Sequence, residues 1–154
     1  FGLTQAAALE DDAEQHSGGS VPDTAALAEK ARGDECFKRR AWDEAISHYT
    51  AALTLDAENA RALCNRSAAY MELKQHQLAL DDALRAAEVE PDWPKALFRQ
   101  GLALRGMRRY DMAISCFAEG MTKDPKNPDW DNELHRTEEL KKARDIAKTG
   151  PRGG

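Results

Sequence analysis

Three cations and one amide are the side chains in this sequence whose spacing indicates a binding site. They are Lys30, Asn65, Lys95 and Arg99. Lys95 and Arg99 are four residues apart, so they share one face if this segment is helical. Donors of this kind that converged on one groove would form a receptor for an anion. The most economical ligand is the pair of carboxylates of an acidic residue at the end of a protein chain.

The elements that would position these side chains follow a repeat of 34 residues, centred on residues 60–93. Small residues recur at this period. Ala45, Ala79 and Ala113 share one position of the repeat, and Gly33, Ser67 and Gly101 share another. This period is typical of stacked helix–turn–helix units. The predicted units are 26–59, 60–93 and 94–127, followed by a capping helix over 128–148.

Each unit has the pattern of a helical hairpin. In the middle unit, Leu63, Ser67 and Tyr70 lie three and four residues apart on one helical face, and Pro91 ends the second helix. Asp23 is the predicted N-cap of the first helix, which should end near Arg39. The other hairpin helices are predicted at about 42–56, 60–73, 76–90, 94–107 and 110–123. We therefore predict an all-α fold, a right-handed α-solenoid of three hairpins with a C-terminal capping helix.

The last predicted helix has Asn127 as its N-cap and Pro128 in its first turn. Its apolar stripe is predicted to include Trp130, Leu134, Thr137, Leu140, Ala143 and Ala147. Glu133 is predicted to face away from this stripe. A stack of hairpins needs such a cap because its last apolar face would otherwise contact water.

Local sequences around the candidate donors resemble the carboxylate-clamp tetratricopeptide repeat (TPR) domains of co-chaperones. They are Lys30-Ala31-Arg32-Gly33, Asn65-Arg66-Ser67-Ala68-Ala69-Tyr70 and Pro91-Asp92-Trp93-Pro94-Lys95. The resemblance covers about residues 23–148. It implies a non-catalytic adaptor whose concave groove binds the acidic C-terminal peptide, Glu-Glu-Val-Asp, of heat-shock protein 90 or 70. Peptide residues before the terminus would then lie along Phe37, Ala68, Met71, Leu102 and Arg105, although Phe37 and Leu102 could instead be helix-packing residues.

One residue departs from this pattern. Asp34 stands where the resemblance leads us to expect an asparagine. A carboxylate there would oppose a ligand carboxylate, and Lys30 is placed to pair with it. We therefore expect weakened or altered peptide binding.

Two alternative functions stay open at this point. One is a TPR scaffold for a different protein partner, and the other is a targeting domain of a larger enzyme. The sequence shows no phosphate-binding loop, no catalytic grouping and no basic stripe, so we expect no enzyme activity, cofactor or nucleic-acid partner. Cys36, Cys64 and Cys116 form no metal-binding or disulfide pattern, which favours a reducing, cytoplasmic location.

The two ends of the chain are predicted to lie outside the repeat domain. Residues 1–22 contain four acidic residues and no Lys or Arg, and they end in a Ser/Gly/Pro stretch. We interpret them as a flexible acidic leader or linker, with an acidic interaction tail as the alternative. Residues 149–154 are predicted to be a disordered tail. No run of apolar residues is long enough for a transmembrane helix, so no membrane partner is expected.

Overall fold

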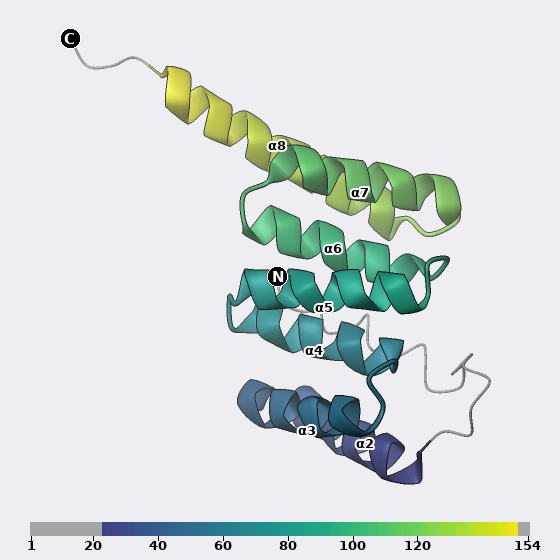
Figure 1. The fold of residues 1–154 in the computed structure, drawn as a ribbon. Coiled ribbons are helices and arrows are strands. Elements are labelled where there is room, and N and C mark those ends of the chain that lie inside the picture. Colours follow the sequence, from purple (N-terminus) through teal and green to yellow (C-terminus); the bar gives the residue numbers. More distant parts are fainter. Residues whose placement is uncertain (1–22, 151–154) are drawn as a thin grey trace.

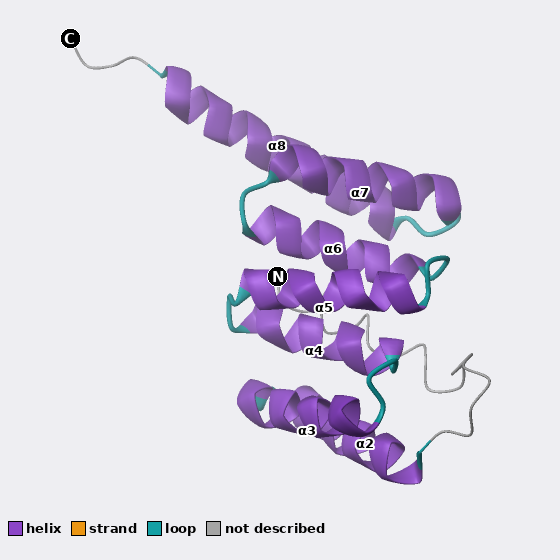
Figure 2. Ribbon diagram, viewed as in Figure 1, coloured by secondary structure: helices purple, strands orange, loops and turns teal. Residues whose placement is uncertain are grey.

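The computed structural model describes residues 23–150. These residues form seven helices and no strand (Figure 2). The helices are α2 (Thr24–Lys38), α3 (Trp42–Leu55), α4 (Ala60–Glu72), α5 (His76–Val89), α6 (Pro94–Gly106), α7 (Tyr110–Lys123) and α8 (Asp129–Thr149). Their ends lie close to the predicted ones. The predicted leader and residues 151–154 of the predicted tail lie outside the described residues, whereas Thr149, which we expected in the tail, belongs to α8.

The helices stack as three hairpins, with α2 packed on α3, α4 on α5 and α6 on α7 (Figure 1). Each second helix also contacts the first helix of the next unit, and α8 packs on α7. In addition, α2 contacts α4 and α4 contacts α6, so the three first helices are neighbours. We call the surface that they form together the first-helix face. The predicted all-α solenoid with a capping helix is confirmed.

Glycine allows the closest approach of helices within two of the hairpins. A Cβ atom added at Gly33 would lie 2.6 Å from the Tyr49 ring, and one added at Gly101 would lie 2.5 Å from the Phe117 ring. Real Cβ atoms are not found so close to other atoms, so an alanine at either position would force the ring or the helix to move.

The turn inside each hairpin contains one residue in the left-handed region. These residues are Arg40, Lys74 and Arg108, with φ of 62°, 61° and 62°. In the middle turn, the Lys74 N–H donates to the Met71 carbonyl at 3.0 Å, and the Gln75 N–H donates to the Tyr70 carbonyl at 2.9 Å. These bonds satisfy carbonyls at the end of α4, as in a Schellman motif. A residue with a basic side chain thus adopts a left-handed backbone conformation that glycine would adopt without steric cost.

The capping helix α8 is held by Trp130, whose side chain is 1% exposed. Its ring packs edge-on against Phe98, with 5.3 Å between ring centroids, and its Nε1 donates to Asp124 Oδ2 at 3.2 Å. Gly120 makes room for the indole, since a Cβ atom there would lie 2.1 Å from it. The predicted apolar contact of Trp130 with the stack is confirmed.

Two predictions about α8 are corrected. Glu133 does not face away from the stack: its side chain is buried and pairs with Arg105 of α6. Residues 130, 133 and 137 are spaced three and four apart, so Glu133 shares the face of Trp130, and the cation offsets the cost of burying its carboxylate.

The second half of the predicted apolar stripe is exposed, and it consists of Leu140, Ala143 and Ala147. This part of α8 contacts α7 through polar side chains instead, because Lys141 pairs with Asp111 and the Arg144 guanidinium lies 5.0 Å from the centroid of the Tyr110 ring.

Asn127 is also not the N-cap of α8, because the helix begins at Asp129 and Pro128 occupies the capping position. The Asn127 side chain still acts locally, since its Oδ1 accepts a hydrogen bond from the Asp129 N–H at 3.0 Å. The Asn127 side-chain oxygen therefore accepts from one of the first backbone N–H groups of α8, although Asn127 lies one residue before the capping position.

None of the helices in residues 23–150 is both long enough and apolar enough to cross a membrane.

Replacing Lys74 by glycine should stabilise the protein by about 0.5–1 kcal/mol, because glycine adopts its left-handed conformation without the Cβ clash. The measurement is urea unfolding followed by circular dichroism. Arg85→Gly is the matched control, because Arg85 is an exposed residue inside α5 and a glycine there should destabilise by about 1 kcal/mol. A Lys74→Gly protein that is less stable than the wild type would contradict the prediction.

Replacing Trp130 by alanine should lower the free energy of unfolding by about 3 kcal/mol, because it leaves a cavity against Phe98 and Gly120. Thermal and urea unfolding measure this change. Ile146→Ala serves as the control, since Ile146 lies on the same helix and is 68% exposed, so its truncation should be nearly neutral. Equal losses for both variants would show that the burial of Trp130 does not stabilise the cap.

Candidate functional site

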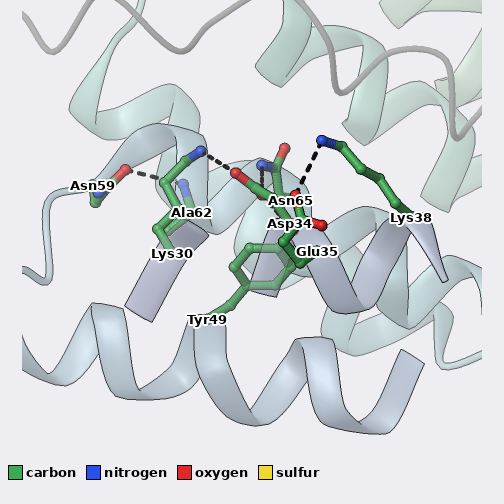
Figure 3. A network of polar contacts seen from close by, with 8 residues as sticks. All are labelled: Lys30, Asp34, Glu35, Lys38, Tyr49, Asn59, Ala62 and Asn65. Carbon is green, nitrogen blue, oxygen red and sulfur yellow. Dashed lines mark hydrogen bonds and ion pairs between the residues drawn. The ribbon is translucent and has the colours of Figure 1, made fainter. Parts of the chain in front are cut away.

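Asp34 is the centre of a hydrogen-bond network that joins the first helices α2 and α4 to α3, the second helix of hairpin 1 (Figure 3). Lys30, one turn earlier in α2, donates from Nζ to Asp34 Oδ2 at 2.8 Å. Asn65 of α4 donates from Nδ2 to Asp34 Oδ1 at 2.9 Å. Tyr49 of α3 donates its hydroxyl to the same Oδ1 at 2.6 Å. The predicted pairing of Lys30 with Asp34 is confirmed, and Asn65 meets them at the same place.

Tyr49 is the member of this network that the sequence analysis missed as a polar group. Its ring is buried against Gly33, and this packing carries the hydroxyl to the neighbouring Asp34. Burial, followed by the negative charge of Asp34, raises the pKa of Tyr49, so the hydroxyl stays protonated and donates. One feature of the sequence could have indicated this polar role. The equivalent residue of unit 3 is Phe117, which has no hydroxyl, so ring packing alone does not require a tyrosine in unit 1.

The two cations of α6 have different environments. Lys95 is partly exposed, and its Nζ lies 5.9 Å from the centroid of the Trp93 ring. Arg99 is fully buried, which corrects our expectation of an accessible side chain there. Burial lowers the pKa of the Arg99 guanidinium, and negative charge from Glu72 acts in the opposite direction. Lys95 is therefore the more accessible of the two cations of α6, and a role of either one in ligand binding stays a prediction.

Four of the residues predicted along the peptide path lie in the hydrophobic core. Phe37 packs edge-on against Trp42, with 4.8 Å between ring centroids, in a cluster that includes Ala68. Met71 and Leu102 belong to the cluster around Phe117 and Trp130. The structure favours the packing interpretation of Phe37 and Leu102. A contact between any of these four residues and a peptide stays a prediction.

Arg105, the last residue predicted along that path, points to the capping helix. Its guanidinium pairs with Glu133, and its side chain is 12% exposed. It also lies 3.5 Å from the Thr137 hydroxyl oxygen. This corrects our placement of Arg105 on the open part of the face, because the carboxylate of Glu133, which sequence periodicity did not place there, draws the guanidinium toward α8.

The described residues show no arrangement for metal binding. Within 23–150, no group of three or more His, Cys, Asp or Glu side chains could hold a metal ion. Cys36 and Cys64 are buried thiols. Burial raises the pKa of the Cys116 thiol to about 11, so this side chain is protonated near neutral pH.

Comparison with known proteins identifies the repeat. Residues 19–101 match the family model of the TPR repeats of BSK1-like serine/threonine-protein kinases, and residues 96–129 match a tetratricopeptide repeat model. The chain belongs to the tetratricopeptide repeat family. It is 42% identical to human tetratricopeptide repeat protein 28 over 110 residues, which are 71% of this chain and 4% of that protein. It is 33% identical to Hsp70-Hsp90 organizing protein 3 of Arabidopsis thaliana over 121 residues, 78% of this chain and 22% of that protein.

A solved TPR structure has the same fold. The first TPR of Spaghetti (RPAP3), bound to the HSP90 peptide SRMEEVD, superimposes with a TM-score of 0.74 at 29% identity, over 80% of this chain and 98% of that one. The present TPR chain thus matches a whole solved domain, while it spans only a small part of the length of the curated relatives. Activities and partners of those longer proteins do not follow from the match.

Replacing Tyr49 by phenylalanine should lower the free energy of unfolding by about 1 kcal/mol, because Asp34 loses a buried donor while the ring packing stays. Chemical unfolding measures the loss. Tyr70→Phe is the control, since the Tyr70 hydroxyl makes no hydrogen bond in the described structure and its ring contact with Arg66 is kept. If the two variants are equally stable, the Tyr49–Asp34 bond does not contribute to folding.

Proposed function

We propose that this TPR domain is a non-catalytic adaptor that binds the acidic C-terminal peptide of heat-shock protein 90 or 70 along the first-helix face. The observation that carries the proposal is the convergence on Asp34 of Lys30 from unit 1 and Asn65 from unit 2. Donors from separate repeats here bind a carboxylate, which is the chemistry that an acidic peptide needs. Lys95 of unit 3 adds a cation on the same face.

The relatives support this choice of ligand. Hsp70-Hsp90 organizing protein 3 carries both chaperones in its name, and the Spaghetti domain holds an HSP90 peptide. A peptide with several carboxylates would make charge-assisted hydrogen bonds worth about 1.5–3 kcal/mol each. After the cost of association, a few such bonds give a Kd on the order of micromolar. The predicted carboxylate clamp of Lys30, Asn65, Lys95 and Arg99, and a cytoplasmic location, belong to this proposal.

A second candidate is a scaffold for a different protein, or the targeting domain of a larger enzyme. The specific observation in its favour is Asp34 itself, whose carboxylate already pairs with Lys30 and accepts a hydrogen bond from Asn65. The small share of the longer relatives that the chain spans is compatible with this candidate. The peptide experiment below separates the two functions.

A calorimetric titration with the peptide Ser-Arg-Met-Glu-Glu-Val-Asp should give a Kd on the order of micromolar, and Lys95→Ala should weaken it about tenfold because one charge-assisted bond is lost. Lys123→Ala is the matched control, since it removes the same charge from α7, where Lys123 pairs with Glu119 away from the first helices. A peptide with both glutamates changed to glutamine tests the dependence on acidic side chains. Absence of binding, or equal binding of the neutral peptide, would favour the scaffold function.

A further inference from the structure

The three turns inside the hairpins lie along one edge of the stack. Figure 2 shows these turns at the left, whereas the connections between units lie at the right. The left-handed residues of the three turns are Arg40, Lys74 and Arg108, which share one position of the repeat and are all exposed. We call them the turn cations. They are not visible as a basic stripe in the sequence, because each lies one full repeat from the next.

The charges of the turn cations are not neutralised by the described structure. Within residues 23–150, none of the three forms an ion pair. The Arg40 guanidinium lies 5.9 Å from the centroid of the Trp42 ring, which leaves its charge in place. Near the third turn, the carboxylate of Asp111 is paired with Lys141 of α8. An anion that approaches this edge therefore meets cations that have no carboxylate of their own.

The backbone of the turns does not explain why these residues are basic. Glycine adopts the left-handed conformation without steric cost, whereas any residue with a Cβ atom is strained there. The dipole of the preceding helix favours a cation near its C-terminal end, but α2 and α6 already have Lys38 and Arg105 in their last turns. A ligand that binds the side chains accounts for a long cation at the same strained position in all three units.

An exposed apolar residue accompanies the cation in units 2 and 3. Leu78 and Met112 follow Lys74 and Arg108 by one helical turn, at the starts of α5 and α7, and they are 47% and 54% exposed. They also share one position of the repeat, which Glu44 occupies in unit 1. This edge of units 2 and 3 therefore offers positive charge beside apolar surface. Such a combination suits a ligand that carries carboxylates and apolar side chains together.

The spacing of the turn cations favours an extended protein segment as the ligand. Adjacent turn cations are two layers of helices apart, and packed helices are about 8–10 Å apart, so the row is about 32–40 Å long. An extended chain of about 10–12 residues spans this length. A membrane or a nucleic acid would also meet the exposed carboxylates of Asp43 and Glu44 beside the first turn, and the net charge of the chain is −5. A flexible segment can follow the row and avoid them.

From these observations we propose that the turn cations form a second interaction surface, which binds an extended acidic segment of a partner protein with apolar residues between its carboxylates. This surface is made by the turns at the edge of the stack and not by the first-helix face. The inference goes beyond the proposed function and does not rest on it. With two surfaces, one domain holds two protein segments at the same time.

The experiment measures binding of a fluorescent peptide by anisotropy. The peptide has three copies of Glu-Glu-Leu-Asp, acetylated and amidated so that it carries no terminal carboxylate. Replacing all three turn cations by glycine should weaken the Kd by about tenfold or more, because three charge-assisted contacts are lost. Glycine also removes the backbone strain, so the variant should be at least as stable as the wild type, and lost binding would not reflect unfolding.

Two matched variants and one site variant serve as controls. Arg85→Gln, Lys123→Gln and Lys126→Gln together remove the same charge from exposed residues away from the turns. Arg40→Lys, Lys74→Arg and Arg108→Lys together keep the charge of the edge. Both triple variants should bind within about threefold of the wild type. Lys95→Ala, on the first-helix face, should do the same.

Each other result overturns the proposal. If the wild type does not bind the peptide, or if the glycine variant binds equally well, the turn cations form no such surface. Equal losses in the glycine and glutamine variants would show an effect of overall charge. A loss in Lys95→Ala would place the peptide on the first-helix face, so the inference would fail while the proposed function stands. If phosphatidylserine vesicles or duplex DNA bind through the turn cations and the peptide does not, the partner is not a protein segment.

Discussion

The close approach of a residue without a side chain to an aromatic ring is the contact on which the rest of this structure depends. It occurs inside hairpin 1 between Gly33 and Tyr49, inside hairpin 3 between Gly101 and Phe117, and again where Gly120 receives Trp130 of the capping helix. Dispersion forces decrease steeply with separation, so a short distance between helix axes yields many favourable atom contacts. In hairpin 2 the equivalent small residue is Ser67, which is buried and donates its hydroxyl to the Ala79 carbonyl at 2.7 Å.

This packing also positions the polar site. Because Gly33 admits the Tyr49 ring, the hydroxyl reaches Asp34, the next residue in α2. Asn65 then connects Asp34 to α4, so a single carboxylate joins the first two units on the first-helix face. Unit 3 has the same close contact but with Phe117, which offers no hydroxyl. The same kind of glycine–ring contact is therefore accompanied by a polar network in unit 1 and by apolar packing in unit 3.

The sequence predicted the architecture well, because the small residues and Pro91 recur at positions that only a stacked hairpin explains. It also placed Lys30, Asp34 and Asn65 on neighbouring helices, since the period fixes which helical faces meet. The sequence predicted less well which side chains are exposed to solvent. Arg99 and Glu133 are buried because of neighbours on other helices, and the partner of Arg105 lies in α8. A periodic pattern identifies the face of a residue, but it does not identify the charge that compensates for burial.

Asp34 therefore has two roles that oppose each other. As an acceptor of three hydrogen bonds it couples units 1 and 2, which in a stacked repeat protein contributes to the stability of the terminal unit. In the proposed peptide site, its negative charge would oppose the approach of an anionic ligand to Lys30 and Asn65. An asparagine would lessen the repulsion but would accept weaker hydrogen bonds, since bonds to a charged acceptor are the stronger ones. In the proposed site, affinity for a ligand carboxylate and cohesion of the first two repeats would thus compete for the same two donors.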